Sequence, residues 1–123
     1  MITEDYVSFE IAKLLKEKGF DAECDYLYAD GKLVRAQGYA CNWNDGETLF
    51  ADYKNECSAP TLQMTMKWLR EHNIALNVCY FLGMWYYSMY RTDVNSSGFT
   101  SKDFDTYEQA CEAGIKYCLE NLI

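Results

Sequence analysis

Residues 74–90 read IALNVCYFLGMWYYSMY, and this stretch decides the fold. If Leu82-Gly83 is a two-residue turn, the flanking segments form an antiparallel hairpin in one register. Its cross-strand pairs are Tyr80 with Trp85, Val78 with Tyr87, and Leu76 with Met89. One face then holds only apolar and aromatic side chains: Ile74, Leu76, Val78, Tyr80, Trp85, Tyr87 and Met89. A slip of one residue would mix the two faces, so the sequence predicts this register and places the apolar face under helices.

The opposite face of the same hairpin carries smaller and more polar side chains: Ala75, Asn77, Cys79, Tyr86, Ser88 and Tyr90. A two-layer arrangement leaves this second face partly open to solvent. Tyrosine is enriched at protein interfaces, and the chain has eleven tyrosines. We therefore take Asn77, Tyr86 and Tyr90 as a candidate interaction surface.

A second hairpin is predicted around Asp30-Gly31, with Leu27 facing Val34 and Tyr28 facing Leu33. The pattern of residues 38–58 fits two structures. Thr48–Tyr53 could be a short strand, or the whole stretch could be an ordered loop that Trp43 and Phe50 hold in place.

Three helices have clear end signals. The first is expected to begin at Thr3 and to end at Gly19. The second starts at 58–61 and runs to about Glu71, with Asn73 as a left-handed terminator. The last begins near Thr106, with Gln109 at capping-box spacing.

The predicted order is helix, hairpin, an unclear stretch, helix, hairpin, helix. This order indicates an α+β fold, a two-layer sandwich whose antiparallel sheet of four to five strands has three helices packed mainly on one face. The length of 123 residues fits a single domain covering 1–123.

The formal charge is −8, and the acids are concentrated at the two ends of the chain. Residues 59–92 contain one acid against three bases. This balance argues against nonspecific binding to nucleic acid or to anionic lipid, because phosphate neutralisation needs clustered Lys and Arg. No run of 18 apolar residues is present, so no membrane span is expected.

Six cysteines are spaced too widely for a C-x-x-C zinc pair: Cys24, Cys41, Cys57, Cys79, Cys111 and Cys118. The first residues do not resemble a signal peptide. We therefore expect free, mostly buried thiols and a reducing, cytoplasmic compartment.

Candidate catalytic groups are few. His72 is the single histidine and lies at the end of the second predicted helix. The helix dipole favours a cation at that end. A thiol–histidine pair with Cys57 cannot be placed from the sequence. Carboxylate pairs at Asp103/Asp105 and Glu108/Glu112 fit helix capping, and Lys67 with Arg70 forms a small basic patch that is typical of a solvated face. The sequence therefore predicts no catalytic, cofactor-binding or metal-ligating residues and no enzyme activity.

Two segments carry a resemblance: 58–71, SAPTLQMTMKWLRE, and 105–123, DTYEQACEAGIKYCLENLI. Together with the start at 2–10, they resemble a family of short proteins from gut Bacteroidales and from their phages and mobile elements. The resemblance covers nearly the whole chain and is weakest at 38–57 and 93–102. It implies a bacterial cytoplasmic setting and brings no activity or site residues.

Three functions stay open at this point. The first is a non-enzymatic binding or accessory module that contacts a protein partner, or a second copy of itself, through the tyrosine-bearing face. The second is an acidic inhibitor or adaptor from a mobile element that acts on a basic, nucleic-acid-handling protein. The third is an enzyme with an unrecognised site.

Overall fold

The computed structural model describes residues 1–45, 56–95 and 97–123. The chain divides into two compact units, Met1–Thr61 and Leu62–Ile123, which are considered separately below. The α+β class is confirmed, since helices and antiparallel sheets occur in both units. A single domain spanning the whole chain stays a prediction.

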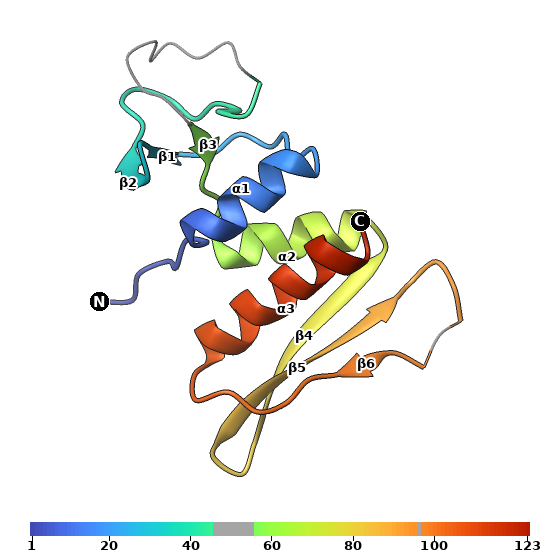
Figure 1. Cartoon of the computed structure of the whole chain (residues 1–123). Coiled ribbons are helices and arrows are strands. Elements are labelled where there is room, and N and C mark those ends of the chain that lie inside the picture. The colour runs from blue at the N-terminus through green and yellow to red at the C-terminus, as the bar shows by residue number, and fades with distance from the viewer. Residues whose placement is uncertain (46–55, 96) are drawn as a thin grey trace. The chain divides into compact units, whose positions relative to one another are not determined.

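Among its described residues, the first unit contains one helix and a three-stranded sheet (Figure 1). Its elements are α1 (Phe9–Glu17), β1 (Tyr26–Ala29), β2 (Lys32–Arg35) and β3 (Cys57–Ser58), and the strand order is β2-β1-β3. The predicted hairpin register is confirmed, because Leu27 pairs with Val34 and Tyr28 with Leu33. Asp30 and Gly31 both have positive φ, as a two-residue turn of this kind requires.

The predicted start of the first helix at Thr3 is wrong. Ser8 is the N-cap, and its side chain accepts a hydrogen bond from the Ile11 N–H. The residues before it are extended instead, since the Val7 N–H donates to the Pro60 carbonyl at 3.0 Å. Backbone pairing with a distant segment therefore outweighs the capping signal at Thr3.

Trp43 holds the segment that follows β2 in place, as expected. Its indole N–H donates to the Cys24 carbonyl at 2.8 Å, and the side chain is buried. The Asn44 side chain accepts from the Ser58 N–H and donates to the Phe20 carbonyl. Phe50 and the expected strand at Thr48–Tyr53 fall within 46–55, outside the described residues.

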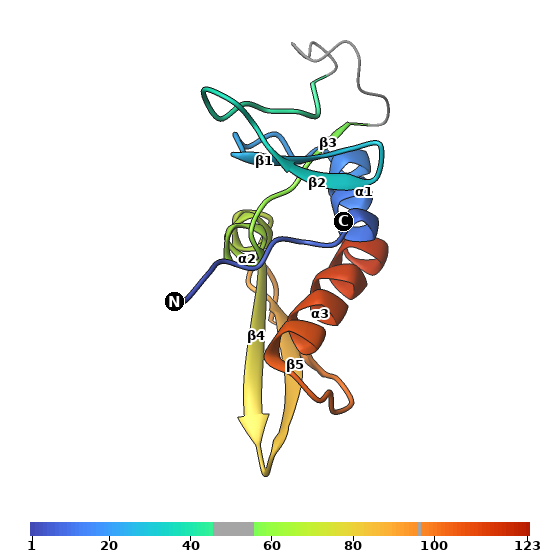
Figure 2. The same ribbon diagram turned by 90° about the vertical axis from the view of Figure 1, so that its left-hand side faces the viewer.

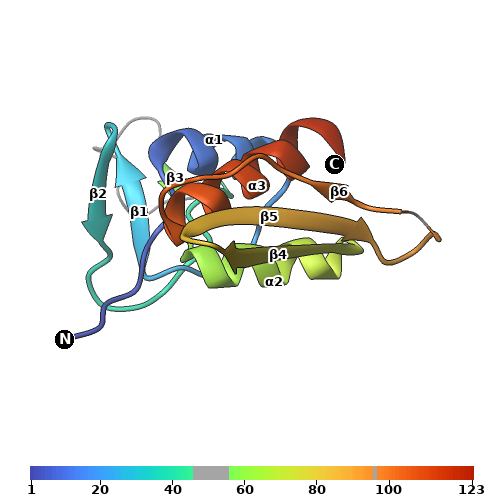
Figure 3. The ribbon, with the colours of Figure 1, turned by 90° about the horizontal axis from the view of Figure 1, so that it is seen from below.

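Over residues 62–95 and 97–123, the second unit contains two helices and another three-stranded sheet. Its elements are α2 (Leu62–Glu71), β4 (Ile74–Phe81), β5 (Met84–Arg91), β6 (Phe99–Thr100) and α3 (Tyr107–Asn121). The strand order is β4-β5-β6, so β4 and β6 are the edges, as seen from below in Figure 3. Both helix end signals are confirmed: Asn73 has a φ of 64°, and Thr106 forms a capping box with Gln109.

The register of residues 74–90 is the predicted one. Val78 pairs with Tyr87, and the alternation continues unbroken from Ile74–Arg91 to Phe81–Met84. The buried face packs against α2 and α3 (Figure 2), and its most buried members are Ile74, Leu76, Tyr87 and Met89. Gly114 of α3 lies directly on this face, since a Cβ there would come 2.7 Å from Leu76 Cδ1.

Two details differ from expectation. In the part of the chain that the structure describes, six strands form two sheets of three, whereas four to five strands in one sheet were expected. Ser58 belongs to β3 rather than to the second helix, because it pairs with Leu27. A hairpin turn determines which neighbouring strands pair, but it carries no information on whether two hairpins join, so the division into sheets was not readable.

Candidate functional site

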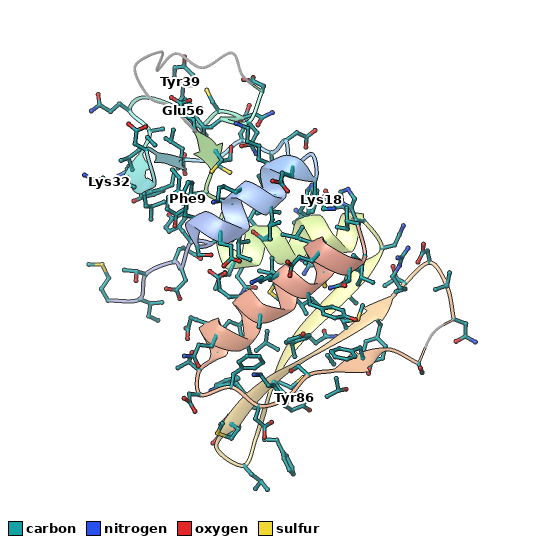
Figure 4. All side chains as sticks on the ribbon, in the orientation of Figure 1. Phe9, Lys18, Lys32, Tyr39, Glu56 and Tyr86 are labelled. Carbon is teal, nitrogen blue, oxygen red and sulfur yellow. The ribbon has the colours of Figure 1, made fainter. Side chains whose placement is uncertain are left out.

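The second unit presents one sheet face that points away from α2 and α3, and we call it the open face. It is formed by the alternate side chains of β4 and β5 that point away from α2 and α3: Ala75, Asn77, Cys79, Phe81, Met84, Tyr86, Ser88 and Tyr90. Thr100 of β6 joins this face, since it pairs with Ser88. Figure 4 shows Tyr86 on the side of the sheet away from α3.

A hollow of about 460 Å³ lies on the open face. Its lining combines three aromatic rings, three hydroxyl side chains and one carboxylate: Phe81, Tyr86, Tyr90, Ser88, Thr100, Ser101 and Asp103. The lining contains no Lys, Arg, His or Cys. Such a surface offers ring faces and a negative charge, which together suit an apolar chain with a cationic end.

Tyr86 is electrostatically tied to its neighbours on this face. It lies opposite Cys79 in the β4–β5 register. The hydrogen bond with Cys79 raises the pKa of the Tyr86 phenol, and the nearby Tyr90 and Asp103 add to that shift in the same direction. The phenol therefore stays protonated at neutral pH.

Tyr90 is held by the backbone of the loop before β6. A Cβ on Gly98 would overlap the Tyr90 ring, and Gly98 has a φ of 76°. Only glycine meets both conditions without strain. On the other side of the hollow, Ser101 accepts from the Tyr87 N–H at 2.9 Å and donates to the Lys102 carbonyl at 2.7 Å. The contact with Tyr87 fixes the rim of the hollow to the sheet.

The structure brings Tyr86 and Tyr90 together at the hollow. Asn77 lies on the same face, opposite Ser88, but does not line the hollow. The sequence reasoning missed Phe81, Thr100, Ser101 and Asp103. Phe81 adjoins the turn, β6 is too short to show alternation, and Asp103 resembles an ordinary helix-capping acid.

The first unit contains a second hollow, of about 650 Å³. It lies between one stripe of α1 and the start of β3, and its lining is Phe9, Lys13, Lys16, Glu17, Glu56 and Cys57. Phe9 and Glu56 are labelled in Figure 4. The Lys13 ammonium lies 4.7 Å from the centre of the Phe9 ring, and the Lys16 ammonium donates to the Glu56 carbonyl at 2.8 Å.

Two lining groups of this second hollow are unusual. The Glu56 carboxylate is buried, and neither of its oxygens has a hydrogen-bond partner among the described residues. Burial raises the pKa of the Cys57 thiol, while Lys16 and Lys13 oppose that rise. A raised pKa argues against an activated nucleophile, because the thiolate is the reactive form.

The remaining candidates from the sequence lie in different parts of the chain. Cys57 lies in the first unit and His72 in the second. The ring centres of His72 and Trp68 lie 4.1 Å apart with the ring planes tilted by 42°, and the His72 Nδ1 lies 3.0 Å from the Trp68 carbonyl. Lys67 and Arg70 are both exposed on α2.

Acidic side chains gather near the start of α3, where Asp103, Asp105 and Glu112 line a third hollow. Within the described ranges, no group of three or more His, Cys, Asp or Glu side chains is arranged to hold a metal ion. All six cysteines are free, and four of them are buried. In the same ranges, no helix has the length and apolar character needed to cross a membrane.

Comparison with known proteins found no matching family model, no matching curated protein and no matching solved structure.

Proposed function

We propose that the protein is a non-enzymatic binding module that contacts a protein partner through the open face of its second unit. The observation that carries this proposal is the hollow lined by Tyr86, Tyr90 and Phe81. Tyrosine side chains provide large contact areas at a low cost in side-chain entropy, and they are frequent hot spots of interfaces.

The chemistry of the hollow indicates the kind of partner. Asp103 adds a negative charge beside the aromatic rings, and the chain as a whole carries −8. A Lys or Arg side chain of a partner segment fits both features, since its stem lies on the rings while its charged end meets the carboxylate. The proposed partner is therefore a protein segment that presents an exposed basic side chain.

A peptide selection tests this proposal. Displayed random peptides are selected on the immobilised wild-type protein, and the enriched peptides are then measured against purified variants. We expect enrichment of Lys or Arg, and we expect Y86S/Y90S to weaken binding by about tenfold or more. D103N should weaken binding and make it less dependent on salt.

Tyr39→Ser is the matched control, because Tyr39 is an exposed tyrosine of the first unit. Its affinity for the selected peptides should equal that of the wild type. Peptides that bind Y86S/Y90S as tightly as the wild type would contradict the proposal.

A further inference from the structure

The outer side of β4 carries a row of backbone groups without strand partners. β4 is the first strand in the order β4-β5-β6, and within the described ranges no strand pairs with its outer side. Trp85 exchanges both of its backbone hydrogen bonds with Phe104, so its N–H and C=O point away from β4. Its cross-strand partner Tyr80 must then point its own groups away from β5. The same alternation directs the backbone of Val78 outward.

This edge lacks the features that normally protect an edge strand. β4 is eight residues long, contains no proline, and pairs with β5 without a bulge. No Asp, Glu, Lys or Arg occurs between Asn73 and Tyr90. Natural sheets usually protect such edges with charges, proline, bulges or short strands, because an open edge is a template for pairing with another strand.

Exposure increases along β4 towards the turn. Ile74 and Leu76 are buried, whereas Tyr80 is 60% exposed and Phe81 is 66% exposed. The accessible part of the edge is therefore Val78–Phe81. Two large aromatic side chains in this part, Tyr80 and Phe81, are largely exposed in the described structure.

We propose that two copies of this chain pair through β4, antiparallel and across a two-fold axis at Cys79. In this register Val78 of one copy exchanges hydrogen bonds with Tyr80 of the other. The two Cys79 side chains face each other on the axis, and Phe81 lies beside Asn77 of the second copy. The pairing joins the two three-stranded sheets into one sheet of six strands.

Two observations favour a second copy over an unrelated strand. An antiparallel strand pair is self-complementary, so the same donors and acceptors serve both sides of a two-fold interface. The charge distribution also favours it, since two chains of charge −8 repel each other wherever their acids meet. The uncharged stretch from Asn73 to Tyr90 is a surface where two copies approach without that repulsion.

The pairing depends on the backbone of β4 and not on the proposed partner binding through Tyr86 and Tyr90. A variant such as Y86S/Y90S should lose peptide binding and keep the dimer. The two proposals can therefore fail separately.

Sedimentation of the 123-residue chain under reducing conditions tests the pairing. We expect the dissociation constant of the wild-type dimer to lie below about 200 µM, as for a weak complex with a small interface. C79K and C79D each place two like charges opposite each other on the axis, so each should weaken dimerisation by about tenfold or more. An equimolar mixture of C79K and C79D should restore the dimer, because opposite charges then meet.

Ser88→Lys is the matched control, because Ser88 lies on the same face of β5, one strand further from the axis. It should dimerise like the wild type. A wild type that stays monomeric at about 200 µM would overturn the proposal. So would folded C79K and C79D, verified by circular dichroism, whose mixture stays monomeric.

Oxidative cross-linking is an independent measurement that needs no charged variant. The directly opposite residues of a non-hydrogen-bonded pair have Cα atoms about 4.5 Å apart, within reach of a disulfide. Mild oxidation of the wild type should therefore give a covalent dimer through Cys79, and C79S should abolish it. S88C/C79S should not cross-link, and cross-linking of that variant as efficient as the wild type's would contradict the proposed register.

Discussion

Leu82 has a left-handed backbone, with a φ of 49°. The residue is 83% exposed, so little packing offsets the cost of that conformation. This conformation costs a residue with a Cβ about 1–2 kcal/mol, and asparagine tolerates it better than leucine. We expect L82N to raise the free energy of unfolding by about 0.5–1 kcal/mol in urea titrations. The neighbouring F81N has no positive φ to relieve and should give no gain; an equal gain from both variants would exclude this explanation.

Glu56 combines burial with an unpartnered carboxylate, as far as the described residues extend. A buried charge without partners costs more than a buried neutral amide of the same shape. E56Q should therefore stabilise the protein by about 1–3 kcal/mol at neutral pH, measured by urea unfolding. Glu17 lines the same hollow but is exposed. E17Q is therefore the control, and it should change the free energy of unfolding by less than about 0.5 kcal/mol. A destabilised E56Q would mean that the carboxylate has a stabilising partner.

Single residues were predictable where the chain has one low-energy solution. Asn73 and Gly19 were expected to adopt left-handed backbones and do so. Thr3 was expected to cap the first helix, but the N-cap is Ser8, because Val7 pairs with Pro60. A contact between residues so far apart in sequence gives no local signal.

Helix α3 approaches the sheet at Gly114, where the space for a methyl group is missing. A Cβ would lie 2.7 Å from Leu76 Cδ1 and 3.0 Å from Tyr87 Cγ. Helix propensity alone favours alanine by about 1 kcal/mol, but overpacking costs about 1–3 kcal/mol. We expect the steric cost to exceed the propensity gain, so that G114A lowers the free energy of unfolding.

The double variant L76A/G114A separates these two effects. Removing the Leu76 side chain vacates the space that the new methyl group needs, so the two substitutions should couple favourably in a double-mutant cycle. Independent, additive effects would show that Gly114 and Leu76 do not compete for the same space.

Elements with strong local patterns were predicted well, and short ones were not. The register of β4 with β5 followed from alternation around a two-residue turn, and it is confirmed over the whole hairpin. β3 and β6 have two residues each, which is too few for any alternation to be read. The candidate site shows the same limit: Tyr86 and Tyr90 came from a long strand, whereas Thr100 and Asp103 come from β6 and the loop after it.

At the scale of the whole molecule, buried thiols make the folded protein less stable as the pH becomes alkaline. Burial raises the pKa of Cys24, Cys111 and Cys118 to about 12, against 9.0 for an exposed thiol. Between pH 9 and about 12 the unfolded chain therefore binds fewer protons than the folded one, so stability falls as pH rises. Below pH 9 the stabilisation from these protonated thiols is fully present.

Urea unfolding at about pH 8 and about pH 10.5, with a reductant present, measures this effect. The free energy of unfolding should be lower at the higher pH. C118A starts from a lower stability because it leaves a cavity, but it should lose less between the two pH values. An equal loss in C118A and wild type would show that Cys118 does not contribute.

The two-residue turn between β4 and β5 also has a kinetic consequence. Every contact of this hairpin joins residues close in sequence, so its formation costs little loop-closure entropy and takes about 1–10 µs. The pairing of Tyr28 with Cys57 in the first unit spans a much longer stretch of chain. We expect the hairpin to form early in the second unit, so that V78A slows refolding in stopped-flow experiments more than it accelerates unfolding. A V78A variant that mainly accelerates unfolding would place the folding nucleus elsewhere. If V78A mainly slows refolding, the rate at which this unit folds depends chiefly on residues 74–91.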